Sequence, residues 1–245
     1  IPATAASDFK ALTFEPVQST GCMSGTCIGL VSGGIDSPVA IARMAVAGWK
    51  IIPMHFSMEP VAGPEGEKKC IDLLLHLKGL DGKVGEAVRT GLHNQLVVVP
   101  VMEVLTLFTE DWNNKEYFIH MKRLFNAITT LLVEDFPEVT HVLTGENLGQ
   151  VSSQTLSNLG AIEMATPLKP LRPLLGFDKI DIMQMARSLG TLKISEGPEV
   201  CDALGPVHPA TVSNLEWLEK SENRNGGLDM LAAKAFSMRK AIELS

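Results

Sequence analysis

The chain has 245 residues, of which 45% are hydrophobic and 20% are charged, and its formal net charge is -7. No run of the sequence reaches the roughly 18 apolar residues of a membrane helix, so we expect no membrane contact. The acidic balance excludes a broad basic surface for nucleic acid, because phosphate contacts need clustered Lys and Arg. Four cysteines make no disulfide framework, and without a signal peptide they favour a reducing, cytoplasmic setting.

Apolar strand patterns alternate with helical patterns along the chain. Strands are predicted over residues 28–31, 51–56, 96–101 and 139–144, and helices over 38–47, 65–78, 115–134, 146–158 and 178–189. This alternation is typical of parallel βαβ units, so the predicted fold class is α/β with a doubly wound parallel sheet. Ligands of such sheets bind at the carboxyl ends of the strands.

The first predicted strand leads into a turn that is suited to hold phosphate. Gly33 and Gly34 let the backbone bend sharply and approach a ligand closely. The start of the following helix offers unpaired N–H groups and the positive end of the helix dipole. Ser32 and Ser37 add hydroxyl donors, and Asp36 offers a carboxylate that could hold Mg²⁺ against the phosphates.

The turn is neither a Walker A loop nor a dinucleotide-binding motif. Pro38 is expected at the first position of the following helix, where proline is best tolerated. The order SGGIDS over residues 32–37 resembles the pyrophosphate loop (PP-loop) of the ATP pyrophosphatases, which split ATP between its α and β phosphates and attach AMP to a substrate oxygen. A glycine-rich turn without a ligand is the alternative interpretation.

The second predicted strand ends in His55 and Phe56. A backbone edge at this point could bond adenine N1 and N6 while Phe56 or Met58 covers the ring. A strand-end histidine without a ligand is the alternative for His55.

The fourth predicted strand leads into Gly145 and then into a polar helix with Gln150, Ser152, Ser153 and Gln154. These side chains are neutral donors and acceptors, and no general base stands among them. The pattern suits recognition of a nucleotide or base edge more than hydrolysis, although a capped amphipathic helix would also produce it.

Four segments in this order resemble the tRNA 4-thiouridine synthetases, also called tRNA sulfurtransferases and linked to thiamine biosynthesis. The segments are 32–38 (SGGIDSP), 144–155 (TGENLGQVSSQT), 171–179 (LRPLLGFDK) and 198–201 (PEVC). The resemblance implies an adenine nucleotide alpha hydrolase-like fold, with a PP-loop ATP pyrophosphatase domain over residues 28–210. It also implies ATP and Mg²⁺ as cofactors and tRNA as the partner that is modified.

By that resemblance, the ATP contacts lie in the loop and at three strand ends. They fall on Leu30, Val31, Ser32, Gly33, Gly34, Asp36, Ser37, His55, Phe56, Gly145 and Gln154. A basic residue on the helix before the fourth strand also contacts ATP in the family. Arg123 is the better-spaced match, with Lys122 beside it, and a solvated helix face is the alternative for this pair.

The resemblance implies two chemical steps, with Asp36 and Cys201 as the catalytic residues. Adenylation of the uracil 4-carbonyl supplies a leaving group, with Asp36 assisting the metal and the pyrophosphate. A persulfide then delivers sulfur, and Cys201 assists its release by forming a disulfide with the carrier. Glu199 and Asp202 oppose ionisation of Cys201, and a buried thiol without chemistry is the alternative.

The remaining cysteines do not form a known metal motif. Cys22 and Cys27 are four residues apart, which matches neither Cys-x-x-Cys nor a zinc knuckle. An iron–sulfur cluster on Cys22, Cys27 and Cys201 is left open, although the Cys-x-x-Cys pair of some archaeal relatives is absent. Cys70 follows a helical pattern with neighbouring leucines and is expected in the core.

Only 31 residues precede Ser32 and 44 follow Cys201, so we expect this sequence to lack the family's RNA-binding THUMP module and C-terminal rhodanese domain. We therefore expect residues 1–27 to be an extension or the remnant of a lost domain, and 211–245 to be a C-terminal helical segment. A persulfide or sulfide donor would act in trans, and a separate domain or subunit would bind the RNA. Another adenylating enzyme of the superfamily, or a nucleotide-binding module without thiolation activity, stays open as a function.

Overall fold

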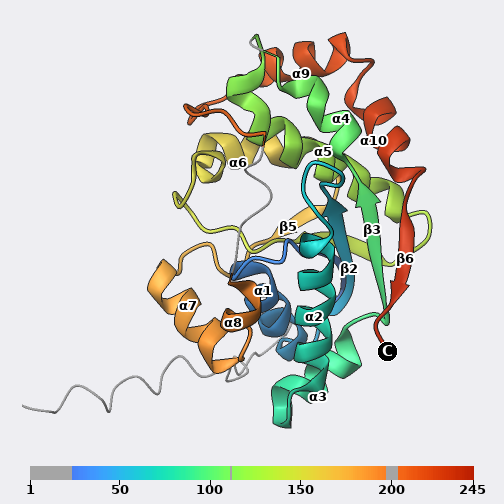
Figure 1. Ribbon diagram of the computed structural model, residues 1–245, viewed down its shortest axis with the longest axis vertical. Coiled ribbons are helices and arrows are strands. Elements are labelled where there is room, and N and C mark those ends of the chain that lie inside the picture. The colour runs from blue at the N-terminus through green and yellow to red at the C-terminus, as the bar shows by residue number, and fades with distance from the viewer. Residues whose placement is uncertain (1–23, 111, 197–203) are drawn as a thin grey trace, which may run out of the picture.

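The computed structural model describes residues 24–110, 112–196 and 204–245. Within them six strands form one sheet in the order β5-β4-β1-β2-β3-β6 (Figure 1). The strands are β1 (Thr26–Leu30), β2 (Lys50–Ser57), β3 (Gln95–Pro100), β4 (Val139–Leu143), β5 (Lys169–Leu171) and β6 (Lys240–Glu243). β1 to β5 pair in parallel, whereas β6 runs antiparallel to β3 at the edge. The four predicted strands are confirmed, and β5 and β6 are additional.

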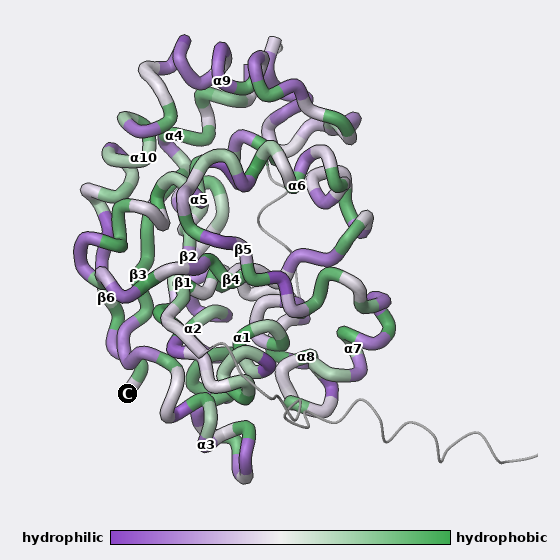
Figure 2. The backbone as a smooth tube through the Cα atoms, turned by 180° about the vertical axis from the view of Figure 1, so that it is seen from behind, coloured by the Kyte–Doolittle hydropathy of each residue, from purple (hydrophilic) through white to green (hydrophobic). Residues whose placement is uncertain are grey.

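Helices cover both faces of the sheet, which confirms the doubly wound α/β class. One face carries α1 (Asp36–Val46), α2 (Glu65–Gly79), α3 (Gly82–Gly91), α7 (Lys179–Ser188) and α8 (Leu192–Ser195). The other carries α4 (Met102–Leu105), α5 (Tyr117–Leu132) and α10 (Leu228–Phe236). Side chains alternate between the two faces along a strand. Ile51 of β2 therefore packs under α1 and its neighbouring helices, whereas Ile52 packs on the opposite face with α5 and α10. Figure 2 shows hydrophobic colour along β3 and hydrophilic colour over much of the outlying α9 (Leu215–Arg224).

The start of α1 differs from the prediction. The helix begins at Asp36, so Pro38 is its third residue and not its first. The position still suits proline, because the first four N–H groups of a helix have no partner within it. The earlier start places Asp36 in the first turn, where the helix dipole stabilises a carboxylate.

The predicted helix over residues 146–158 is wrong. The chain instead crosses this region as an irregular segment with one 3₁₀ turn, η4 (Ser152–Gln154), before α6 (Leu156–Glu163) begins. Gly149 has a φ of 74°, a left-handed conformation that ends helical geometry. Thr155 then caps α6 by accepting a hydrogen bond from the backbone N–H of Asn158 (3.2 Å).

Residues 211–245 contain α9, α10 and β6, so this segment is not purely helical. α10 packs on α5, and β6 extends the sheet beside β3. On α9, Trp217 meets Trp112 edge to face, with ring centroids 6.2 Å apart. Among the described residues, no helix combines the length and the apolar character that a membrane span requires.

Candidate nucleotide site

A cavity of about 740 Å³ lies at the carboxyl ends of β1, β2 and β4. At this point β1 has β2 on one side and β4 on the other, so the strand order changes direction and leaves a crevice. The structure brings eleven of the predicted ATP contacts to its wall: Leu30, Val31, Ser32, Gly33, Gly34, Asp36, Ser37, His55, Phe56, Gly145 and Gln154.

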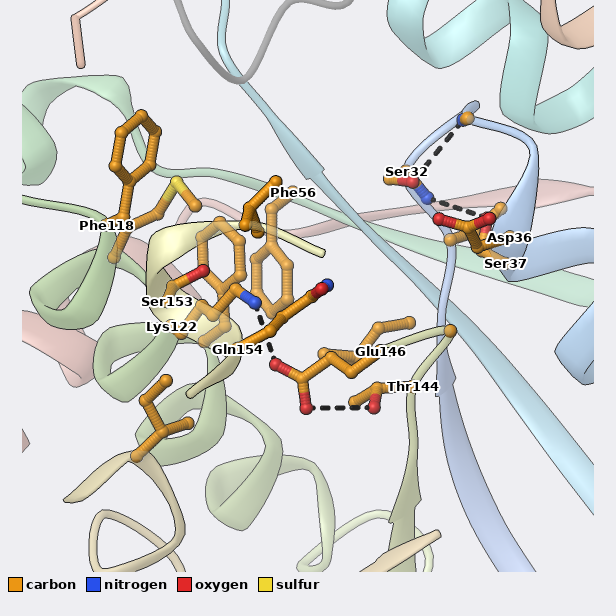
Figure 3. A pocket seen from close by; sticks show the side chains of 18 of the residues that line it. Ser32, Asp36, Ser37, Phe56, Phe118, Lys122, Thr144, Glu146, Ser153 and Gln154 are labelled. Atoms are coloured by element: carbon orange, nitrogen blue, oxygen red, sulfur yellow. Dashed lines mark hydrogen bonds and ion pairs between the residues drawn. The ribbon is translucent and has the colours of Figure 1, made fainter. Parts of the chain in front are cut away.

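The predicted phosphate loop forms one side of the cavity (Figure 3). The backbone N–H of Ser32 donates to Ser37 Oγ (3.3 Å), and the N–H of Gly34 donates to Ser32 Oγ (3.3 Å). The Asp36 carboxylate lies beside Ser37 at this end of the cavity. The loop therefore presents hydroxyl groups, the amino end of α1 and one carboxylate to a ligand.

Two glycines allow the loop to be this compact. Gly33 has a φ of 78°, and a Cβ there would lie 3.3 Å from Lys69 Cβ. A Cβ on Gly145 would lie 2.9 Å from both the Asp36 carbonyl carbon and the Ser37 nitrogen. Because this distance is below any real Cβ contact, Gly145 is needed where the end of β4 meets the start of α1.

His55 is a buried, neutral support for the loop. Burial lowers the pKa of its imidazole, so the ring carries no charge at pH 7. Its Nδ1–H donates to the carbonyl of Val31 (2.9 Å), directly before the loop. Cys70 Sγ lies 3.2 Å from the same nitrogen, and this cysteine is fully buried in the core, as predicted.

Aromatic and polar side chains form the opposite side of the cavity. Phe56 stacks on Phe125 of α5, with ring centroids 3.9 Å apart and planes 8° from parallel. Figure 3 shows Lys122 and Gln154 near Phe56, with Phe118 further away on the same side of the cavity. Together they build a wall of flat apolar surface with polar groups at its edge.

The polar wall predicted after β4 also faces the cavity, although its backbone is not helical. Gln150, Ser152, Ser153 and Gln154 all line it. The side-chain oxygens of Gln150 and Gln154 are buried and have no hydrogen-bond partner among the described residues. Since buried polar groups are normally bonded, these two acceptors favour a ligand with donor groups.

Glu146 anchors the charges on this side. Its carboxylate accepts hydrogen bonds from Lys122 Nζ and from Arg172 Nε, each at 2.7 Å, while Thr144 Oγ1 lies 3.2 Å away. Burial opposes ionisation of Glu146, but the two cations outweigh it and lower the carboxyl pKa from 4.5 to about 2. Arg172 also pairs with Glu163 of α6. Glu146 is thus charged at pH 7 and pairs with both Lys122 and Arg172, while Glu163 supplies a second negative charge to Arg172.

The structure corrects the choice of Arg123 as the basic residue at the nucleotide. Arg123 is only 3% exposed, and its guanidinium bonds Glu222 of α9 (2.6 and 2.9 Å) and the carbonyl of Ala161 (2.6 Å). It does not line the cavity, whereas Lys122 does. Successive helical residues point about 100° apart, so only one of the two can face the ligand.

The cysteine predictions are tested only in part. Cys22 and Cys201 lie outside the described residues. Cys27 is fully buried in β1, and burial raises the pKa of its thiol to about 12. Cys27 is therefore a protonated thiol of the core in this structure, and the cluster on Cys22, Cys27 and Cys201 stays a prediction. Within the described part of the chain, no group of three or more His, Cys, Asp or Glu is placed to hold a metal ion.

Several residues of the cavity wall were not predicted from the sequence. Phe118 and Phe125 line the cavity from α5, and Lys69 lines it from α2. The spacing of Phe118, Lys122 and Phe125 is that of one helix face, a signal that could have identified them. Lys69 carries no such signal, because nothing local distinguishes it from the exposed Lys68.

A sequence model of the thiamine biosynthesis protein (ThiI) family matches residues 22–225. Probable tRNA sulfurtransferases from Clostridium kluyveri and Moorella thermoacetica are each 32% identical to this chain, over 214 and 212 residues. The matches cover 86% of this chain but 53% and 52% of the relatives, so the chain spans about half the length of the curated relatives it matches. A crystal structure of a 4-thiouridine synthetase–RNA complex with bound ATP superposes with a TM-score of 0.79 and 33% identity, covering 89% of this chain and 55% of that one.

Proposed function

The chain belongs to the thiamine biosynthesis protein (ThiI) family, and we propose that it uses ATP to activate a tRNA uridine for replacement of its 4-oxygen by sulfur. The observation that carries the proposal is that one and the same cavity joins a phosphate loop at one side to an aromatic and amide wall at the other. This arrangement suits a reaction in which a nucleotide and a base-like acceptor meet.

The cavity supports a definite orientation of ATP. We place the phosphates at the loop of residues 32–37 and the adenine beside the end of β2. The carbonyl of Met54 in β2 accepts a hydrogen bond from the backbone N–H of Val31 (2.8 Å), the residue that follows β1. Beyond this bond, β1 no longer covers that edge of β2. Residues two apart in a strand direct their backbone groups to the same side, so the N–H and C=O of Phe56 face the space beyond β1. They are placed to bond adenine N1 and N6.

Lys122 takes the role that the family resemblance assigned to Arg123. Its ammonium group is held by Glu146 and lies close to Gln154 in the cavity wall. Since that ammonium is held by Glu146 and has three donors, it can still donate a hydrogen bond to the nucleotide.

The proposed chemistry has two steps. In the first, the uracil 4-oxygen attacks the α-phosphorus, the bond to the bridging oxygen breaks, pyrophosphate leaves with the electron pair, and N3 gives its proton to solvent. In the second, the terminal sulfur of a persulfide attacks C4 and AMP leaves. The Cys201 thiolate then attacks the inner sulfur, so the new C–S bond stays while Cys201 and the carrier form a disulfide that a thiol reductant must reopen.

Magnesium fits the phosphate side of the cavity. Asp36 offers one carboxylate there, and Mg²⁺ is commonly held by one or two carboxylates together with the phosphates of its substrate. When bound, the ion would neutralise phosphate charge during adenylation. Asp36 is therefore the residue that we propose to hold it.

The test is incubation of the chain with ATP, Mg²⁺, a sulfide donor and unmodified tRNA. We expect release of AMP and the absorbance of 4-thiouridine in the tRNA. Release of AMP without 4-thiouridine would indicate that the chain carries out adenylation but not sulfur transfer. Neither product, despite measurable ATP binding, would favour a nucleotide-binding module.

Substitution of Cys201 separates the two steps. With a persulfide carrier as donor, Cys201→Ala should abolish thiolation while the dissociation constant of ATP stays unchanged. Thiolation at the wild-type rate would contradict the role of Cys201.

A further inference from the structure

Four cationic side chains of the described residues line the cavity, and they differ in what neutralises them. Lys122 and Arg172 share Glu146. None of the ion pairs within the described part of the chain includes Lys69 or Lys179. Lys179 is exposed at the first residue of α7, whereas Lys69 is half-buried. Lys69 therefore brings a positive charge that no described carboxylate cancels.

Lys69 is built into the support of the phosphate loop. A Cβ added to Gly33 would lie 3.3 Å from Lys69 Cβ and 3.5 Å from the carbonyl oxygen of Gly66, which is one turn earlier on α2. The loop therefore lies directly against this part of α2. Lys69 Nζ donates to the carbonyl of Ser195 (3.3 Å), and Ser195 Oγ donates to the carbonyl of Gly34 (3.2 Å). Lys69 and Ser195 thus connect the loop to both α2 and α8, which pack together (Figure 1).

We propose that Lys69 binds the β- and γ-phosphates of ATP and stabilises pyrophosphate as it leaves. This assignment rests on the proposed function, because it takes the loop as the phosphate site. An ammonium group has three donors, so Lys69 can keep its bond to Ser195 and still donate to phosphate oxygens. As the acceptor oxygen bonds the α-phosphorus and the bond to the bridging oxygen breaks, negative charge moves onto pyrophosphate. The attraction between a fixed cation beside the loop and the pyrophosphate oxygens is strongest as this charge develops.

Lys69→Met tests the assignment, with Lys68→Met as the matched control. Methionine keeps an unbranched side chain against Gly33 and removes the charge. Lys68 is the exposed neighbour on the same helix, so its substitution removes an equal charge elsewhere. The measurement is the dissociation constant of ATP, pyrophosphate and AMP, each in the presence of Mg²⁺.

We expect Lys69→Met to weaken ATP and pyrophosphate binding about 10- to 100-fold and AMP binding less than about twofold, as loss of a charged hydrogen bond implies. Lys68→Met should change none of the three constants. Lys69→Arg, which keeps the charge, should recover part of the loss. The contrast between ATP and AMP separates a phosphate contact from a purely structural role.

Two results would overturn the assignment of Lys69 alone. One is wild-type ATP affinity in Lys69→Met. The other is an equal loss for ATP and AMP together with a lower Tm, which would indicate that Lys69 only packs α2 against α8. A wild-type chain that binds no ATP would overturn the proposed function and this assignment together, so the two failures are distinguishable.

Discussion

Lys122 and Arg123 are adjacent on α5 and have opposite surroundings. Lys122 Nζ reaches Glu146 at the cavity wall, whereas the Arg123 guanidinium is buried against Glu222. The two residues lie at nearly the same separation along the chain from β4. Sequence spacing therefore could not show which of them contacts ATP. The choice is made by Glu222, which is 99 residues further along the chain and becomes a neighbour only when α9 packs on α5.

Substitution of each residue should therefore have a different consequence. Lys122→Met should weaken ATP binding about tenfold, the value of one charged contact, and should cost less stability than Arg123→Met, because Arg172 still pairs with Glu146. Arg123→Met should lower the free energy of unfolding by about 3–5 kcal/mol, because it leaves the Glu222 carboxylate buried without its main partner. ATP titration and urea unfolding of both variants would check this, and a stable Arg123→Met protein would contradict it.

Glu146 predicts a dependence of stability on pH. Its pKa is about 2 in the folded protein and starts from 4.5, so ionised Glu146 stabilises the fold above pH 4.5, and this contribution is lost as the pH falls toward 2. The shift corresponds to about 3 kcal/mol. Glu146→Gln should lose most of that stability at pH 6 and much less at pH 3, as measured by urea unfolding. An equal difference at both pH values would contradict the assignment.

At the scale of elements, the segment after β4 shows where local patterns mislead. Residues 146–158 are predicted as a polar helix, yet Gly149 adopts a positive φ and the helix begins only at Leu156. The segment is held instead by distant carbonyl groups, because Asn147 Nδ2 donates to the carbonyls of Leu174 and Phe177. Such partners lie on other elements, so no periodicity within the segment reports them.

The junction of β4 with α1 gives a prediction at this scale. A methyl group at Gly145 would meet the backbone of Asp36 and Ser37, so Gly145→Ala should cost about 1–3 kcal/mol of stability and weaken ATP binding. Gly160→Ala is the control, because nothing lies within 4 Å of its added Cβ on α6. That variant should be neutral or more stable by up to about 1 kcal/mol. Thermal unfolding and ATP titration measure both effects, and unchanged affinity in Gly145→Ala would count against the close junction.

At the scale of the whole molecule, residues 211–245 contribute side chains to the core. Leu231, Ala232 and Ala235 of α10 are buried in the same apolar cluster as α5, and β6 pairs with β3. Removal of residues 211–245 should therefore expose that cluster, leave Arg123 unpaired and abolish cooperative unfolding. Circular dichroism during urea unfolding would show a broad transition without a defined midpoint. A cooperative transition at the wild-type midpoint would show that this segment is dispensable.

The parts of the fold that the sequence predicted are those with local signals. Four strands and the phosphate loop follow from apolar runs and from the order of small residues after β1. β6 was missed because its pairing with β3 joins residues far apart in the chain. Lys69 was missed for the same reason, since its position at the loop depends on how α2 crosses Gly33. Long-range packing therefore supplied what local patterns could not.

The positions of the aromatic indoles decide what intrinsic fluorescence can report. All three tryptophans are described, and none lines the cavity: Trp49 is buried beside His141, and Trp112 and Trp217 meet at α9. Fluorescence emission from Trp112 and Trp217 will report whether α9 is docked. Emission from Trp49 will report the integrity of the sheet. Titration with nucleotide should leave the emission spectrum nearly unchanged, so a fluorescent nucleotide analogue is the suitable reporter for occupancy.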